Sequence, residues 1–235
     1  MRVLVATAVP AERDAVARAL PGPGTQARLP GVTLHRTGET LDLLAAGVGP
    51  ALAAASVSAA LTAAALSGDP YGLVVSTGIA GGFAPAAPVG SLVLADEITA
   101  ADLGAETADG FLPVTDLGFG AVTHRPPESL VREAAAATGA LTGAVLTVST
   151  VTGSAARAAV LRETHPRALA EAMEGFGVAE AAAAHGVPVL EIRAVSNPVG
   201  PRDRDTWRIG AALAALTTAF GKLTPVLESW NPHDR

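Results

Sequence analysis

The chain has 235 residues, of which 49% are hydrophobic and 16% are charged, and its formal net charge is −6. This length suits one large core, so we expect a single domain over residues 1–235. The apolar content excludes a disordered chain. The absence of cysteine excludes disulfides, thiol nucleophiles and thiolate metal sites. The net negative charge and the lack of a basic cluster argue against nucleic-acid binding.

The amino terminus MRVLVATAVP has the character of a strand rather than of a signal peptide, because the longer apolar core and the cleavage site are absent. No window approaches the roughly 18 unbroken apolar residues of a membrane span. We therefore expect a cytoplasmic protein that binds neither membrane nor nucleic acid.

Short apolar runs alternate with alanine-rich segments along the chain, a pattern typical of a sheet with helices on both faces. Several runs are continuous Val, Leu and Ile, as in buried central strands. The expected strands are residues 2–6, 41–47, 72–77, 91–97, 144–149 and 188–196. The expected helices are residues 10–20, 50–66, 127–138, 154–162, 175–185 and 206–227. The α/β class follows from this alternation.

The last expected helix has the clearest apolar face, which we expect to pack on the sheet. Its apolar residues recur at alternating steps of four and three: Ile209, Leu213, Leu216, Phe220, Leu223 and Leu227. Residues 99–125 and 198–206 are rich in Gly, Pro and Asp and are predicted to be long loops. Such loops in compact domains tend to carry function or to move.

Candidate functional residues follow the ends of strands, because open α/β sheets bind ligands outside the carboxyl ends of their strands. Glu12 follows the first strand in TAVPAERD, at a helix start where the helix dipole alone also favours an acid. GVGPALAAA, residues 47–55, lacks the third glycine of a dinucleotide-binding fingerprint, which favours a tight turn with close helix packing.

The segment STGIAGGFAP follows the third strand and contains Ile79, Ala80 and Gly81. Its glycines let the backbone approach a ligand closely. The lysine of a phosphate-binding P-loop does not follow, and residues 76–95 contain no Lys, Arg or His. This segment therefore offers no cationic side chain to bind an anionic group of a substrate.

The segment EAMEGFGVAEAAAAHGVPVLEIRAVSN contains Met173 and Glu174 before a helix and Asn197 after a strand. Helix capping is the ordinary explanation of Glu174, and two hydrogen bonds from the adjacent hydroxyls of a ribose are the functional alternative. Met173 offers an adaptable apolar surface, and Asn197 is also explained by a turn with Pro198. None of these residues decides the function alone.

The histidines show no metal-ligand spacing, and we expect no metal site and no cofactor. They are His35, His124, His165, His185 and His233. No G-x-S-x-G segment is present, so a hydrolase triad is not indicated.

Taken together, the motifs resemble the nucleoside phosphorylase and nucleosidase superfamily, over residues 1 to about 227. TAVPAER resembles the glutamate-bearing first loop of the methylthioadenosine/adenosylhomocysteine nucleosidases, GVGPALAAA their glycine turn, and TGIAGG their TGSAGG loop. AMEGFGVA resembles the M-E-[AG] ribose-binding segment, and IRAVSN the R-[AG]-I-S-D segment. The resemblance implies a three-layer αβα fold around a central mixed, mostly parallel twisted sheet, and a homodimer or higher homo-oligomer.

The resemblance also implies an enzyme that cleaves the N-ribosyl bond of a small-molecule nucleoside. The oxocarbenium-like sugar and the departing base require a water activator, a ribose anchor and stabilisation of the leaving group. On the family pattern Glu12 is the general base, and Arg193 helps to hold the water. Met173 and Glu174 bind the ribose, and Asn197 contacts the purine.

Two departures from the family pattern narrow the expected substrate. Adenine-cleaving members carry Asp where this chain has Asn197, and an amide that donates to O6 and accepts from N7–H suits a 6-oxopurine such as hypoxanthine. Ile79 replaces the serine of TGSAGG, so that hydroxyl contact is lost or is supplied by Thr77 or a backbone N–H. Val151 and Thr152 are placed near the base, in a register that a gap in the match leaves open.

The 5′ side of the substrate is expected to differ from a methylthio group, because ITAADLGAET replaces the Tyr-His-Asp segment of many members. The S-N dipeptide and the GPRDRDTW stretch resemble a branch that releases hypoxanthine from a benzoate-bearing nucleoside in a menaquinone pathway. Arg202 and Arg204 are candidates for the benzoate. The alternatives are a methylthioadenosine/adenosylhomocysteine nucleosidase, a phosphate-dependent purine nucleoside phosphorylase, to which Arg13 would contribute, and a non-catalytic nucleoside-binding protein.

Overall fold

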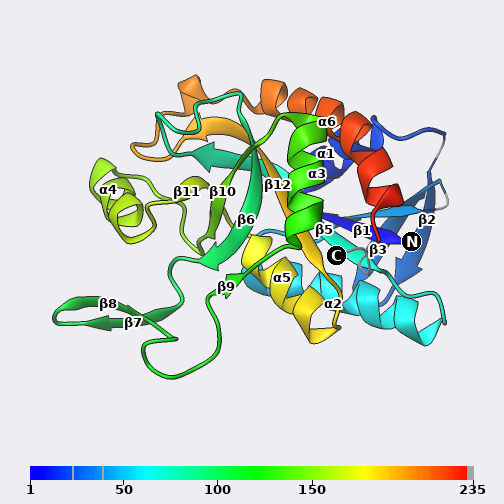
Figure 1. Cartoon of the computed structure of the whole chain (residues 1–235), viewed down its shortest axis with the longest axis horizontal. Coiled ribbons are helices and arrows are strands. Elements are labelled where there is room, and N and C mark those ends of the chain that lie inside the picture. The colour runs from blue at the N-terminus through cyan, green and yellow to red at the C-terminus, as the bar shows by residue number, and fades with distance from the viewer. Residues whose placement is uncertain (23, 39, 232–235) are drawn as a thin grey trace.

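A computed structural model describes residues 1–22, 24–38 and 40–231, so the histidine at position 233 lies outside the described residues (Figure 1). The strands of the main sheet are β1 (Val3–Thr7), β2 (Thr25–Leu29), β3 (Val32–Thr37), β4 (Leu41–Ala45), β5 (Leu73–Gly82), β6 (Leu92–Ala100), β9 (Thr123–His124), β10 (Leu141–Thr147), β11 (Ala168–Ala172) and β12 (Val189–Pro198). Their order is β11-β10-β6-β12-β5-β1-β4-β3-β2, with β9 paired to β6.

The sheet is mixed. Most of its central pairs are parallel, namely β1 with β4 and β5, β5 with β12, and β10 with β6 and β11, whereas β6 pairs antiparallel with β12. The β2–β3 hairpin extends one edge in antiparallel fashion. At the other side β11 also pairs antiparallel with β5, so that β5, β12, β6, β10 and β11 close into a ring of strands. This closure brings the ends of β5, β11 and β12 together.

Helices cover both faces of the sheet, which confirms the three-layer αβα prediction (Figure 1). They are α1 (Pro10–Ala17), α2 (Pro50–Leu66), α3 (Glu128–Thr138), α4 (Ala155–Thr164), α5 (Gly175–Ala184) and α6 (Ile209–Ser229). Helices α1, α3 and α6 share one face, while α2 and α5 pack together on the other. All six expected helices are therefore present, with ends that differ by a few residues.

Several strands were missed from the sequence. β2 and β3 are short and partly exposed, and their alternation is interrupted by polar residues. The ALAEA of β11 is rich in alanine, which has low strand propensity. The expected loop 99–125 contains the separate hairpin of β7 (Gly104–Thr107) and β8 (Gly110–Pro113), as well as β9. The expected loop 198–206 contains one 3-10 turn, Arg204–Thr206.

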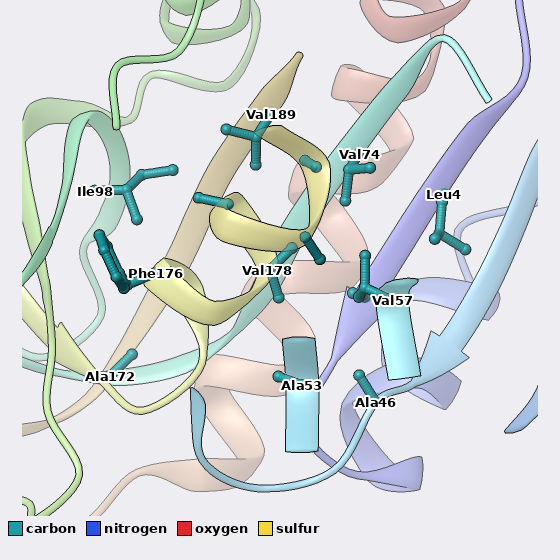
Figure 2. Packing of buried hydrophobic residues seen from close by; sticks show 14 of the residues in the cluster. Leu4, Ala46, Ala53, Val57, Val74, Ile98, Ala172, Phe176, Val178 and Val189 are labelled. Atoms are coloured by element: carbon teal, nitrogen blue, oxygen red, sulfur yellow. The ribbon is translucent and has the colours of Figure 1, made fainter. Parts of the chain in front are cut away.

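The core lies on both sides of the sheet. On the side of α2 and α5, Leu4, Val57, Val74 and Val178 are at most 1% exposed and pack in one cluster (Figure 2). The other side is filled from α6, α3 and α1.

Helix α6 is only partly buried along its predicted face. Leu216, Phe220, Leu223 and Leu227 are fully buried, whereas Ile209 is 41% exposed, so the first turn extends beyond the sheet. The segment Arg204–Ser229 is long and apolar enough to cross a membrane by composition, a property that core helices of soluble proteins share.

Candidate active site

A cavity of about 270 Å³ opens where β1, β5, β11 and β12 end. Besides Arg202, nine residues expected from the sequence line it: Glu12, Ile79, Ala80, Gly81, Val151, Thr152, Met173, Glu174 and Asn197. Arg193 lies behind this lining and is only 1% exposed. The other wall residues include Val48, Glu171, Arg202 and Trp207. Residues far apart in the sequence thus meet because parallel strands end at the same edge of the sheet.

Glu12 is held by three backbone N–H groups. Its Oε2 accepts from Ala8 N at 3.0 Å and from Val9 N at 3.2 Å, and its Oε1 accepts from Ile79 N at 2.9 Å. Glu12 is the third residue of α1, so its bond from the N–H of the N-cap residue Val9 forms half of a capping box. The carboxylate is 4% exposed and is fixed at the cavity wall. Of the two groups considered as substitutes for a serine hydroxyl at position 79, the backbone N–H of Ile79 donates to Glu12 and the Thr77 hydroxyl donates to Ile192 O.

Gly78 provides the space in which Glu12 and Arg193 approach each other. A Cβ on Gly78 would lie 2.6 Å from Glu12 Oε1 and 2.9 Å from Arg193 Nη1. Its φ of +154° is also one that residues with a side chain rarely adopt. The first glycine of TGIAGG is therefore required by the packing of the two charged groups.

Glu174 is fixed by a backbone donor and a buried cation. Its Oε1 accepts from Gly49 N at 3.2 Å, and its Oε2 lies 3.5 Å from Arg193 Nη1. The GVGP turn thus holds the predicted ribose anchor, with Gly49 at φ +90°. Glu174 is the N-cap residue of α5, but its side chain makes no capping bond.

Arg193 joins three carboxylates. Its Nε donates to Glu191 Oε1 at 2.8 Å and its Nη2 to Ser76 Oγ at 3.1 Å. Burial acts to lower the pKa of Arg193, but the nearby carboxylates of Glu191, Glu174 and Glu12 together raise it above its usual value. The guanidinium therefore stays charged inside the protein.

Glu191 was not expected from the sequence. It is fully buried, and among the described residues its Oε2 has no hydrogen-bond partner. Burial raises the pKa of its carboxyl group, and Arg193 offsets this only in part. A Cβ on Gly175 would lie 2.3 Å from the Glu191 oxygens, so the glycine leaves room for the acid. The signal was present in LEIR, because residues two apart on a strand share one face.

Asn197 is oriented by its neighbours. Its Oδ1 accepts from Ser196 Oγ at 2.8 Å, and its Nδ2 donates to Pro198 O at 3.1 Å. The register of β12 against β5 shifts between Val195 and Asn197. A carboxamide has two donor and two acceptor sites, so each end of this amide keeps one for a ligand.

The loop after β12 supplies the outer wall. Arg202 and Trp207 line the cavity, and the Arg202 guanidinium lies 5.2 Å from the Trp207 ring centroid. Arg204 is 5.8 Å from the same ring. Among residues 1–22, 24–38 and 40–231, no group of three or more His, Cys, Asp or Glu side chains is placed to hold a metal ion.

The chain belongs to the phosphorylase superfamily, whose family model matches residues 2–227. It is 79% identical over 235 residues to the futalosine hydrolase of Streptomyces coelicolor, covering 100% of both chains. It is 46% identical over 225 residues to the futalosine hydrolase of Acidothermus cellulolyticus, covering 94% of this chain and 89% of the relative. A futalosine hydrolase mutant of Helicobacter pylori shares the fold at a TM-score of 0.81 and 17% identity, covering 96% of this chain and 99% of that one. The superfamily predicted from the motifs is confirmed.

Proposed function

We propose that this chain is a nucleoside N-glycosidase that hydrolyses the N-ribosyl bond of futalosine, releasing hypoxanthine and dehypoxanthine futalosine in menaquinone biosynthesis. The observation that carries the proposal is one cavity in which the Glu12 carboxylate, the Glu174 carboxylate and the Asn197 carboxamide meet. The full-length identity of 79% to the futalosine hydrolase of Streptomyces coelicolor supports the same substrate.

In the proposed reaction, the carboxylate of Glu12 takes a proton from a water molecule whose oxygen bonds to C1′ of the ribose. The C1′–N9 bond breaks, and its electron pair leaves with the purine. The departing base takes up a proton from solvent at N7, while Asn197 donates to O6 and accepts from the resulting N7–H. Glu174 accepts hydrogen bonds from the ribose hydroxyls, beside Met173. Arg193 positions Glu174 from behind and stabilises the Glu12 carboxylate.

Phosphorolysis is less well supported by the structure than hydrolysis. Arg13, the cation next to Glu12 in the chain, is paired with Asp14 at 2.6 Å and lies 2.8 Å from His35 Nε2, and it is not part of the cavity lining. Among the described residues the cavity lining includes one cation, Arg202, at the outer wall. Phosphate at the position of the water would face Glu12 at close range, which is electrostatically unfavourable.

The 5′ side of the nucleoside is assigned to the outer wall of the cavity. Futalosine carries a benzoate-bearing chain there, and the guanidinium of Arg202 suits its carboxylate. The Trp207 ring, already stacked with Arg202, provides an aromatic surface for the benzoate ring. Arg204 contacts the same Trp207 without lining the cavity, which makes Arg202 the better of the two sequence candidates.

We also propose a cytoplasmic homodimer or higher homo-oligomer. The hairpin of β7 and β8 projects from the body of the protein (Figure 1). This region exposes large apolar side chains, namely Leu103, Phe111, Leu112, Leu117 and Phe119. Exposed apolar surface of this kind marks protein contact sites. Light scattering of the purified chain will give the subunit number.

The test of the reaction is to incubate the protein with futalosine, methylthioadenosine and inosine, with and without phosphate, and to identify the released base by chromatography. Hypoxanthine from futalosine without phosphate is expected. Adenine release from methylthioadenosine as the faster reaction, or a strict requirement for phosphate, would contradict the proposal. Glu12→Gln serves as the control, because it keeps the size of the side chain and removes the base; turnover is expected to fall by about 10²- to 10⁴-fold while binding remains.

A further inference from the structure

Glu171 is a third carboxylate in the cavity, beside Glu12 and Glu174, and the proposed reaction leaves it without a role. It is 5% exposed and lines the cavity wall. Its Oε1 accepts from Thr152 N at 2.8 Å, and its Oε2 accepts from Thr152 Oγ1 at 2.5 Å. A carboxylate oxygen has two acceptor sites, so each of these oxygens keeps one for a ligand.

Glu171 and Asn197 stand on either side of a glycine in one row of the sheet. Gly81 on β5 pairs with Glu171 on β11 and with Asn197 on β12. Residues directly opposite on neighbouring strands project from the same face, and all three residues line the cavity. With strands about 4.8 Å apart, the outer two backbones are separated by roughly 8–10 Å. The row therefore forms a slot with a carboxylate on one side and a carboxamide on the other.

Gly81 has no side chain, and Val199 and Asn197 take up the space beside it. A Cβ there would lie 2.9 Å from Val199 Cγ2 and 3.4 Å from Asn197 Nδ2. A flat base that enters this slot can direct O6 and N7 toward Asn197 and N1 toward Glu171, with Val199 as part of the wall. Thr152, which the sequence places near the base, belongs to the same end of the cavity.

We propose that Glu171 selects 6-oxopurines by accepting a hydrogen bond from N1–H of the base. This inference rests on the proposed function. Hypoxanthine carries a hydrogen on N1, whereas N1 of adenine carries a lone pair. A carboxylate that faces the lone pair is repelled by it and loses a hydrogen bond inside a closed site. Asn197 recognises O6 and N7, and Glu171 recognises N1, so that the two side chains select the base together.

Glu171→Gln separates base selection from a purely structural role. The glutamine carbonyl can still accept from Thr152 N, and its NH₂ can donate to Thr152 Oγ1, so the contacts with the loop are preserved. The same NH₂ opposes N1–H of hypoxanthine but suits the N1 lone pair of adenine. A structural role alone would lower both activities together, whereas base selection changes their ratio.

The experiment compares kcat/KM for futalosine and for its analogue with adenine in place of hypoxanthine. In Glu171→Gln the ratio of the two is expected to fall by about 10- to 100-fold, the value of one hydrogen bond to a charged group. Glu133→Gln is the matched control, because it makes the same exchange at an exposed position of α3 outside the cavity lining; its ratio is expected to stay within about threefold of wild type. An unchanged ratio in Glu171→Gln overturns the inference.

A second measurement uses only the wild-type enzyme, so it tests the inference even if Glu171→Gln does not fold. Inhibition of the wild-type enzyme by hypoxanthine is compared with inhibition by 1-methylhypoxanthine, which lacks N1–H. The methylated base is expected to bind at least about tenfold more weakly; equal inhibition overturns the inference. If the wild-type protein releases no hypoxanthine from futalosine, the proposed function fails. If it does and the selectivity tests fail, only the role of Glu171 is lost.

Discussion

Gly78→Ala tests whether the position of Glu12 determines the rate. The added Cβ would lie 2.6 Å from Glu12 Oε1, whereas ordinary van der Waals contact begins at 3.4 Å, so the carboxylate must retreat by about 0.8 Å. Arg193 Nη1, at 2.9 Å, must also move. Both groups belong to the proposed chemistry, and neither is the residue that is replaced.

The expected loss in rate follows from this displacement. A misplacement of about 1 Å in a reacting group costs on the order of 10²-fold in rate. We therefore expect kcat to fall by about 50- to 100-fold, which corresponds to about 2.3–2.7 kcal/mol of activation free energy. The φ of +154° adds backbone strain of about 1–3 kcal/mol, which lowers the free energy of unfolding.

The assay measures kcat for hypoxanthine release at saturating futalosine, together with the thermal midpoint of unfolding. Gly139→Ala is the matched control, because Gly139 also has a positive φ, of +73°, but a Cβ there would meet no atom within 4 Å. This control is expected to lose stability and to keep its kcat. If Gly78→Ala kept the wild-type kcat while folded, the assignment of Glu12 as the general base would be refuted.

Three further substitutions test other parts of the site. Asn197→Asp replaces an amide with a group that can carry a proton to N7, and we expect the ratio of adenine-nucleoside to futalosine cleavage to rise by about tenfold or more in a base-release assay. Glu191→Gln mimics the protonated acid. Since burial raises the folded-state pKa of Glu191, the wild type loses stability as pH rises from the unfolded value toward that pKa. The thermal midpoint of the wild type should therefore fall relative to that of Glu191→Gln as the pH rises from about 4.5. If the difference between the two midpoints did not change with pH, the raised pKa of Glu191 would be contradicted. Arg202→Ala is expected to raise KM for futalosine about 10-fold and to leave KM for inosine, which lacks the benzoate, almost unchanged.

The sequence predicted many of the residues that line the cavity, because they follow the ends of strands. Glu12, Glu174 and Asn197 each stand beside a motif of the superfamily, and parallel strands bring such residues to one edge of the sheet. Glu171 and Glu191 were missed because each was taken as part of an apolar segment. Their environment arises only from packing, namely the loop at Thr152 and the missing side chain of Gly175.

The sequence predicted the layers of the fold, but it did not predict that five strands close into a ring. Continuous apolar runs identified the central strands β1, β5 and β12, since buried parallel strands need no polar alternation. β11 carries little such signal, because its sequence is ALAEA and its pairing with β5 is long-range. That pairing nevertheless creates the row that contains Glu171, so the least predictable strand places one wall of the cavity.

The charges around Arg193 bear on two properties of the proposed site, namely cleavage of the N-ribosyl bond and the use of water rather than phosphate. Glu12, Glu174 and Glu191 surround one guanidinium, so at least one negative charge remains unbalanced even with Glu191 protonated. We expect this excess to stabilise the positive charge that develops on the ribose as the N-ribosyl bond breaks. The same excess repels phosphate. The excess negative charge thus explains two expected properties: faster cleavage of the N-ribosyl bond and a preference for neutral water over phosphate as the nucleophile. A substitution that removes the charge of Glu12 should weaken both properties together.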